Sequence, residues 1–262
     1  MTQSINVNGT TLAYRFDGPE DAPVVMLSNS LMSNHTMWDP QIEALTARYR
    51  VLRYDTRGHG ASAVPTGPYT MAMLGDDAAA LIDGLGLDKV HFCGLSMGGM
   101  IGQHLGAHHA ERLLSLTLCD TACVMPPASL WDERITQARD VGLGAAVEAT
   151  LERWFTEPYR ASANSEIDKV GAMIQGTDVE GFAGCCAAIR DMDQTAMLAS
   201  INVSTQIIVG RLDPGTPVAA AEVLHENIGG AQLHVIEDAA HLCNIEQPVA
   251  FNAVLMAFLD RH

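Results

Sequence analysis

Positive charge is scarce in this sequence of 262 residues, which has 15 Lys and Arg against 31 Asp and Glu and a formal net charge of −16. Nucleic acids and anionic membranes bind basic surfaces, so this balance makes both poor partners. No apolar run approaches the ~18 residues of a membrane span. The opening MTQSINVNGT lacks the basic start and apolar stretch of a secretory signal. We therefore expect a cytoplasmic protein.

The cysteines have no metal-binding spacing. There are six, and the neighbouring Cys185 and Cys186 are adjacent instead of forming a CxxC pair. With 48% hydrophobic residues the chain can build a substantial core, so a small scaffold that depends on disulfides is excluded. We expect free thiols in a reducing compartment.

Short apolar segments alternate with helical patterns along most of the chain. Asn8-Gly9 between two alternating runs predicts a two-residue hairpin. Strands are expected near residues 24–28, 50–55, 89–94, 112–120, 205–210 and 231–237, and helices near 39–48, 71–85, 97–108, 217–227 and 248–261. This alternation predicts an α/β fold: a mostly parallel sheet with an antiparallel N-terminal hairpin and helices on both faces.

The alternation stops between residues 123 and 194, where several helices and no convincing strand are expected. Such an insertion after the sixth strand predicts a helical cap over the carboxyl ends of the strands, where open sheets bind their ligands. We therefore expect a core made of residues 1–122 and 195–262 and a cap made of 123–194.

The sequence Gly94-Leu95-Ser96-Met97-Gly98 matches G-x-S-x-G between an expected strand and an expected helix. A serine on such a sharp turn has a strained backbone, so its neighbours two residues away must be small. The helix N-terminus behind it favours developing negative charge. Ser96 is therefore a candidate nucleophile.

A nucleophilic serine needs a base and an acid that orients the base, here in the order serine, acid, histidine. Asp213 follows one expected strand and His241 follows the next, so both lie at the edge where Ser96 is exposed. Asp120, after an earlier strand, is an alternative acid. The other histidine in a loop, His59, precedes the serine.

Several segments carry a resemblance to a known family: LSNSL with the following MW, LRYDTRGHGAS, HFCGLSMGGMIGQ, GRLDPGTP and AAHLCNIEQP. Together they resemble the α/β-hydrolase superfamily over nearly the whole chain. More narrowly, the sequence is similar to the 3-oxoadipate enol-lactone hydrolases of bacterial aromatic catabolism. NSL stands where other members have a His-Gly pair, and the cap pieces WDERI, RWFTEP and AAIRDMD match. The family's bend commonly continues NSLG, whereas here it continues Leu31-Met32-Ser33.

This resemblance implies a triad of Ser96, Asp213 and His241 and an oxyanion hole formed by the N–H groups of Leu31 and Met97. It implies hydrolysis of 3-oxoadipate enol-lactone through an acyl-enzyme, with no metal or organic cofactor. The turn RGHG is common in the superfamily, so Arg57 and His59 are interpreted as structural.

Because the net charge of the protein is negative and repels anions, the carboxylate of the lactone needs a positively charged side chain at its binding site. Trp131 and Arg134 share a helical face at i, i+3, so the indole can wall the ring and the guanidinium can bind the carboxylate. Packing of the cap and a surface ion pair are the alternative roles. Arg153 with Trp154 is a second candidate for the substrate site, and Arg190 is a third.

Two other readings remain open. One is a general carboxylesterase, perhydrolase or carbon–carbon bond hydrolase on this scaffold, and the other is a non-catalytic ligand-binding protein that has kept the fold. The sequence does not indicate an oligomeric state.

Overall fold

The computed structural model describes residues 1–162 and 165–262, in which eight strands form one sheet in the order β1-β2-β4-β3-β5-β6-β7-β8. Strand β2 is antiparallel to both of its neighbours, and all the other pairs are parallel. The strands are β1 (Gln3–Val7), β2 (Thr10–Asp17), β3 (Val24–Ser28), β4 (Arg50–Tyr54), β5 (Val90–Leu95), β6 (Leu113–Cys119), β7 (Thr205–Gly210) and β8 (Gln232–Ile236).

The antiparallel part of the sheet begins at the predicted hairpin, which is confirmed. Val7 pairs with Thr10 across the turn, and Asn8 and Gly9 have φ angles of 45° and 70°. Positive φ at both central positions is the backbone of a type I′ turn, which Asn-Gly readily adopts.

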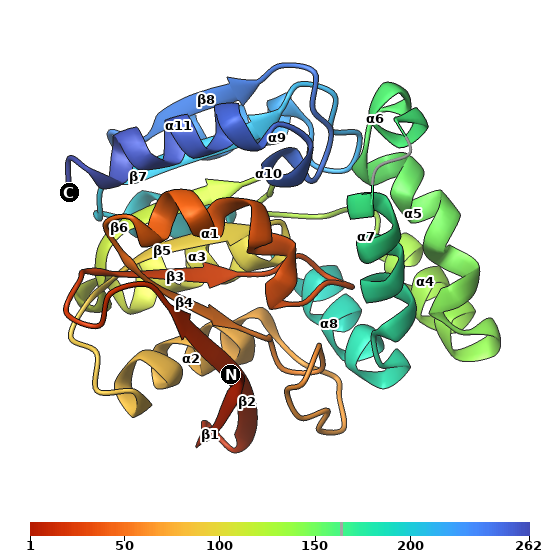
Figure 1. Ribbon diagram of the computed structural model, residues 1–262. Coiled ribbons are helices and arrows are strands. Elements are labelled where there is room, and N and C mark those ends of the chain that lie inside the picture. The colour runs from red at the N-terminus through yellow and green to blue at the C-terminus, as the bar shows by residue number, and fades with distance from the viewer. Residues whose placement is uncertain (163–164) are drawn as a thin grey trace.

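Helices cover both faces of the sheet, as expected. Helices α1 (Asp39–Thr46) and α11 (Pro248–Leu259) pack together on one face, and α2 (Met71–Gly84) and α3 (Met97–His108) pack together on the other (Figure 1). Helix α9 (Val218–Asn227) contacts β7 and β8. Because both faces are covered, β3, β5 and β7 are buried along their whole length, which explains their continuous apolar sequences.

In the described part of the chain, five α-helices lie between β6 and β7 and form the expected cap beside one end of the sheet (Figure 1). They are α4 (Ala128–Val141), α5 (Val147–Trp154), α6 (Glu157–Ala161), α7 (Ser165–Gly176) and α8 (Val179–Asp191). Gln194 N donates to Cys123 O at 2.9 Å, so the entrance and the exit of the cap lie side by side.

The remaining elements are short: η1 (His35–Trp38), η2 (Ala110–Arg112), η3 (Leu143–Ala146), η4 (Thr195–Ser200) and α10 (Cys243–Glu246). In the described ranges, the helices are too short or too polar to cross a lipid bilayer.

Candidate active site

Ser96 occupies the turn between β5 and α3, with φ 57° and ψ −113°. A Cβ on Gly94 would lie 2.1 Å from Gly98 O, and a Cβ on Gly98 would lie 2.2 Å from Ser28 O. The two glycines therefore allow the chain to reverse against β3 at a position that other residues could not occupy. Such a backbone costs about 1–3 kcal/mol, which the surrounding structure must offset.

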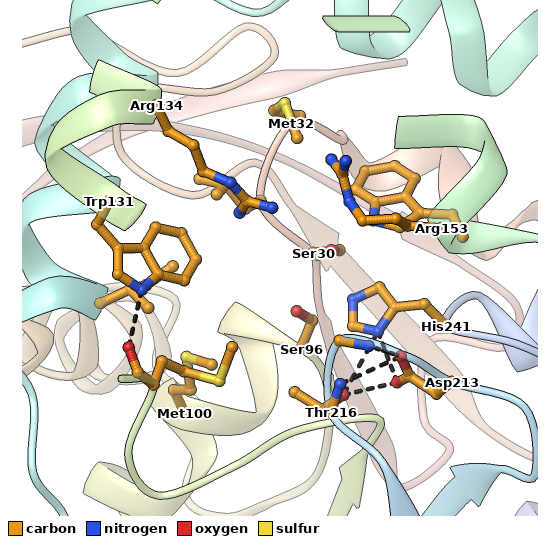
Figure 2. A pocket seen from close by; sticks show the side chains of 15 residues that line it. Ser30, Met32, Ser96, Met100, Trp131, Arg134, Arg153, Asp213, Thr216 and His241 are labelled. Atoms are coloured by element: carbon orange, nitrogen blue, oxygen red, sulfur yellow. Dashed lines mark hydrogen bonds and ion pairs between the residues drawn. The ribbon is translucent and has the colours of Figure 1, made fainter. Parts of the chain in front are cut away.

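The strained turn presents the Ser96 side chain to a cavity under the cap. Ser96 is partly exposed, although its neighbours in β5 and α3 are buried. Its hydroxyl points into the cavity beside the ring of His241 (Figure 2).

His241 is held by Asp213 through a hydrogen bond of 2.8 Å between His241 Nδ1 and Asp213 Oδ2. Thr216 Oγ1 donates to Asp213 Oδ2 at 2.6 Å, and the N–H groups of Gly215 and Thr216 donate to Asp213 Oδ1 at 2.7 and 3.1 Å. Burial alone would raise the pKa of Asp213, but His241 and these donors outweigh it and lower the pKa, so the carboxylate is ionised. Burial likewise opposes a charged His241, but Asp213 outweighs it and raises the pKa of the imidazole.

The alternative acid, Asp120, is engaged elsewhere. Its Oδ1 accepts from Gly210 N at 2.8 Å, and Cys243 Sγ lies 2.9 Å from its Oδ2. Burial, followed by the nearby Asp213 charge, raises the pKa of Asp120 well above its usual range. A neutral Asp120 would stabilise an imidazolium far less than the ionised Asp213, so the geometry favours Asp213 as the orienting acid.

The backbone N–H groups expected to form the oxyanion hole belong to Leu31, in the loop after β3, and to Met97, the first residue of α3. Within residues 1–162 and 165–262, neither the N–H of Leu31 nor that of Met97 makes a hydrogen bond with another protein group. The next amide along the loop, Met32 N, donates to His59 Nε2 at 3.0 Å, and Met32 has a φ of 60°. His59 therefore holds the loop that carries the Leu31 amide.

Asn29 and Ser30, the polar residues at the start of this loop, have different roles. Asn29 is structural: its side chain donates to Tyr54 O at 2.7 Å and accepts from Trp38 Nε1 at 3.0 Å. The Ser30 hydroxyl is buried, lines the cavity, and has no hydrogen-bond partner in the described part of the chain. An unpartnered buried hydroxyl at a cavity wall is available to a ligand.

Two arginines and two tryptophans of the cap line the cavity: Arg134, Arg153, Trp131 and Trp154. Figure 2 shows Trp131, Arg134 and Arg153 around the space that Ser96 faces. The Arg134 guanidinium lies 4.8 Å from the ring centroid of Trp131, so the expected i, i+3 contact is present. Trp131 Nε1 donates to Met125 O at 2.9 Å, and the ring of Trp154 lies 6.0 Å from that of His241. Both indoles therefore pack within the cap and also wall the cavity.

The two arginines lack carboxylate partners. Across the described residues, Arg134 and Arg153 make no ion pair, and Arg153 donates only to Thr150 Oγ1 at 3.0 Å. Burial lowers the pKa of both, and the charge of Arg134 further lowers that of Arg153. Two partly buried cations close to one another attract an anion strongly.

The cap is fastened to the loop that carries His241. Leu242 N donates to Trp154 O at 3.1 Å. Glu246 bridges the two parts: one carboxylate oxygen accepts from the N–H and the hydroxyl of Thr156 in the cap, and the other accepts from Ala240 N at 2.9 Å.

Comparison with known proteins shows the family to which the chain belongs. Residues 23–145 match the family described as the alpha/beta hydrolase fold. 3-oxoadipate enol-lactonase 1 of Acinetobacter baylyi is 38% identical over 97% of this chain and 95% of the relative. The chain belongs to the α/β-hydrolase family.

A solved member of this family, the enol-lactonase from Burkholderia xenovorans LB400, has a TM-score of 0.96 and 40% identity, covering 98% of this chain and 100% of that one. The resemblance to the enol-lactonases drawn from the sequence is thus confirmed. A putative carbamate hydrolase, RutD of Caulobacter sp. strain K31, is 30% identical over 98% of each chain.

The structure of this α/β-hydrolase corrects one expectation and adds to another. Arg190 is not at the cavity: it pairs with Asp132 and Asp191 on the outer surface, at 2.7 Å in each case. Arg153, which was only a second candidate, lines the cavity together with Arg134. In the sequence, Ser30 stands out only as part of the NSL segment. The lack of a partner for its hydroxyl among the described residues results from tertiary packing, for which the sequence has no signal.

Arg57 agrees with the structural role expected of it in this family. It forms a bidentate pair with Asp77, with both contacts at 2.6 Å, and it does not line the cavity.

Proposed function

We propose that this hydrolase opens a small carboxylated enol-lactone, converting 3-oxoadipate enol-lactone to 3-oxoadipate through an acyl-enzyme. One observation carries the proposal: Arg134 and Arg153, which have no carboxylate partner among the described residues, line the same cavity as Ser96 and His241. The cavity therefore combines a serine nucleophile and its base with a site for an anionic group.

Ser96 Oγ attacks the lactone carbonyl while His241 Nε2 accepts its proton. Asp213, bonded to the other ring nitrogen of His241, fixes the tautomer and stabilises the imidazolium that forms. Serine dependence rests on the strained turn, which presents the hydroxyl, and on the ionised Asp213.

The negative charge that develops on the carbonyl oxygen is stabilised by the N–H groups of Leu31 and Met97. Both donors are free of protein partners in the described residues, and their direction is fixed by the loop and by the start of α3. Removing one such donor typically costs about 3–4 kcal/mol of transition-state stabilisation.

Collapse of the tetrahedral intermediate breaks the ring C–O bond and leaves an acyl group on Ser96. The imidazolium of His241 protonates the departing enol oxygen, and the enol then tautomerises to the ketone. Water activated by His241 attacks the acyl-enzyme, releases 3-oxoadipate and returns the proton to Ser96. The scheme uses neither a metal nor an organic cofactor.

The substrate carboxylate is bound by Arg134, with Arg153 beside it, and the indoles of Trp131 and Trp154 wall the ring. This local positive charge overcomes the net charge of −16, which repels anions. The Ser30 hydroxyl supplies a further donor to a polar atom of the substrate.

In this proposal the core of residues 1–122 and 195–262 supplies the catalytic groups, and the cap of 123–194 supplies specificity. The reaction belongs to cytoplasmic aromatic catabolism, in the β-ketoadipate pathway.

A second candidate is hydrolysis of a small carbamate, favoured by the likeness to putative carbamate hydrolases. The same serine and oxyanion hole would act on a carbamate carbonyl, but a neutral carbamate gives the paired arginines no carboxylate to bind. If the substrate were a simple neutral ester, the two arginines would likewise have no carboxylate to bind.

The test compares kcat/KM for 3-oxoadipate enol-lactone, a neutral lactone, a small carbamate and p-nitrophenyl acetate, each with the wild type and with Ser96→Ala. We expect the carboxylated lactone to be preferred by about two orders of magnitude or more, as hydrogen bonds to charged groups allow. Ser96→Ala should abolish all turnover. Equal rates on neutral and carboxylated lactones would reject the substrate assignment, and wild-type protein inactive on every ester would indicate a ligand-binding protein.

A further inference from the structure

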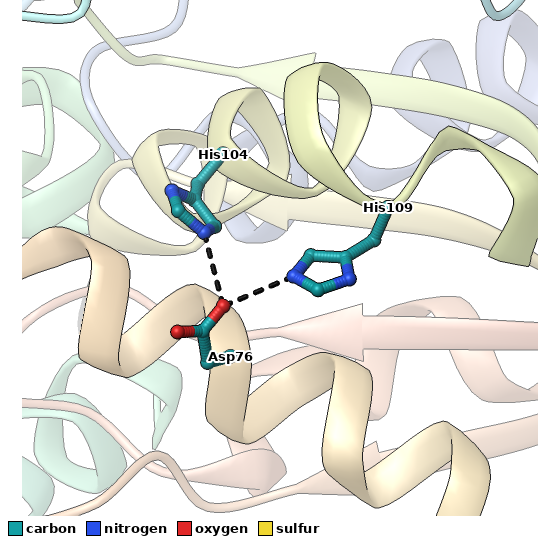
Figure 3. A group of neighbouring side chains, drawn as sticks. All are labelled: Asp76, His104 and His109. Carbon is teal, nitrogen blue, oxygen red and sulfur yellow. Dashed lines mark hydrogen bonds and ion pairs between the residues drawn. The ribbon is translucent and has the colours of Figure 1, made fainter.

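A second group of chemically reactive side chains lies outside the cavity, where α2 and α3 pack together on one face of the sheet. Asp76 in α2, His104 in α3 and His109 just after α3 converge there, and we call them the Asp–His cluster (Figure 3). His104 Nε2 lies 3.2 Å and His109 Nε2 lies 3.0 Å from the same oxygen, Asp76 Oδ1.

The arrangement is held by packing from both helices. His104 is 8% exposed, and a Cβ on Gly75 would lie only 2.3 Å from its ring. Glycine at this position therefore lets the ring lie against α2 and reach the carboxylate in the next position. The ring of His108 also contacts that of His104, with ring centroids 4.5 Å apart and the planes tilted by 40°.

We infer that the Asp–His cluster binds a divalent transition-metal ion, Zn²⁺ or a neighbour such as Co²⁺ or Ni²⁺. The three ligand atoms lie within 4.8 Å of one another. Metal–ligand bonds of about 2.0–2.2 Å place neighbouring ligand atoms of a tetrahedral ion ~3.3 Å apart, close to the two spacings seen here.

The types of ligand atom determine which metal ions the Asp–His cluster can bind. Two imidazole nitrogens and one carboxylate oxygen suit zinc and its neighbours, whereas Ca²⁺ and Mg²⁺ take oxygen ligands. Each imidazole must bind through Nε2 with its proton on Nδ1.

The ion has a route to the cluster from solvent. The side chain of Asp76 is 50% exposed and that of His109 is 29% exposed, so water can complete the coordination. His104 is eight residues beyond Ser96, or ~12 Å along the helix at 1.5 Å per residue. A metal here would join α2 to α3 as a structural clamp, without taking part in the hydrolysis.

The experiment uses the full-length chain with any affinity tag removed. After treatment with a chelator and desalting, Zn²⁺ is titrated in competition with a chromophoric chelator. We expect one equivalent to bind, and Asp76→Asn and His109→Ala each to weaken binding by about tenfold or more. His225→Ala, at an exposed position of α9, is the matched control and should bind as the wild type does.

Two further readouts separate metal binding from a fold defect. Zn²⁺ should raise the melting temperature of the wild type and leave that of Asp76→Asn unchanged. Co²⁺ should give the visible absorption of a coordinated ion in the wild type alone. Turnover by the chelator-treated enzyme should remain unchanged, so the result does not depend on the substrate assignment.

The proposal is overturned if the wild type binds Zn²⁺ no more tightly than Asp76→Asn and His109→Ala do. In that case the cluster is a pair of hydrogen bonds from two histidines to one carboxylate. It is also overturned if His225→Ala weakens binding as much as the cluster variants, because the ion would then be held elsewhere on the surface.

Discussion

His59 Nε2 accepts a hydrogen bond of 3.0 Å from the N–H of Met32, the residue that follows the free amide of Leu31. Burial lowers the pKa of His59 to about 4, so the ring is neutral and can accept this bond throughout the neutral range. A residue of a turn common to the superfamily thus fixes the loop opposite the nucleophile.

Replacing His59 with Ala should lower kcat by roughly tenfold to 100-fold, which is less than the outright loss of an oxyanion donor. KM should change little, because the Leu31 amide stabilises the transition state more than the bound substrate. His59→Gln, which retains an acceptor, should restore part of kcat. An unchanged kcat for His59→Ala in steady-state assays would show that the loop keeps its position without this bond.

Ser30→Gly should raise KM or lower kcat for the lactone while leaving p-nitrophenyl acetate turnover within about twofold. The Ser30 hydroxyl is buried at the cavity wall and has no partner within residues 1–162 and 165–262, and a hydrogen bond to it is worth about 0.5–1.5 kcal/mol. Ser33→Ala is the matched control, since the Ser33 hydroxyl is already bonded to Ser30 O at 2.7 Å. An equal loss on both substrates would argue against a contact with the lactone.

Asp213→Asn and Asp120→Asn should have very different effects on kcat. The first removes the charge that orients His241 and should cost about 10⁴-fold, as loss of the orienting carboxylate does in serine proteases. The second replaces a carboxyl whose pKa is raised by burial and whose oxygens contact Gly210 and Cys243 instead of the His241 ring, so the loss should stay below about tenfold. Steady-state kinetics of both variants on the same ester measures the two losses of kcat. A larger loss for Asp120→Asn than for Asp213→Asn would make Asp120 the orienting acid.

Arg134→Gln and Arg153→Gln should each raise KM for the carboxylated lactone by about tenfold to 100-fold, because a charge-assisted hydrogen bond is worth about 1.5–3 kcal/mol. A neutral ester should be hydrolysed as before. Arg139→Gln is the matched control on the same helix as Arg134, since Arg139 pairs with Glu180 on the exposed surface. If neither cavity variant alters KM, the two cations do not bind the substrate.

The free energy of unfolding should increase as pH rises from about 4 to 6.5. Burial lowers the pKa of both His59 and His91 to about 4, whereas the unfolded chain titrates them near 6.5. Within this window the unfolded state binds more protons, so each histidine adds roughly 1.4 kcal/mol per pH unit. His91→Gln should reduce the slope by about that amount in urea titrations at several pH values, and an unchanged slope would contradict the assignment.

That Ser96, Asp213 and His241 lie at one cavity could be predicted from sequence, because the requirements for this arrangement are local. Ser96 needs small residues two positions away, and parallel strands bring their following loops to one edge, which places Asp213 and His241 together. The choice between Asp213 and Asp120 needed the structure, because both follow strands at that edge. Only tertiary contacts show that Asp120 is bonded to Gly210 and Cys243.

The cap was less predictable. The contact of Arg134 with Trp131 follows from helical spacing, but the position of Arg153 depends on how α5 packs against α7 and its other neighbours. Arg190 was a plausible cation until the structure placed Asp132 of another helix beside it. The Asp–His cluster joins residues 28 and 33 positions apart in sequence, so no local pattern could reveal it.

The bridge from Thr156 through Glu246 to Ala240 has a consequence for recombining parts of related enzymes. His241, the proposed general base, lies on a segment that Glu246 links to the cap. A cap grafted from a relative would therefore have to bring a matching partner for Glu246. Without that partner, one oxygen of the buried Glu246 carboxylate would lose both of its donors and keep only the contact of the other oxygen with Ala240 N, beside His241. A chimera designed to change substrate preference would then lose turnover on every substrate.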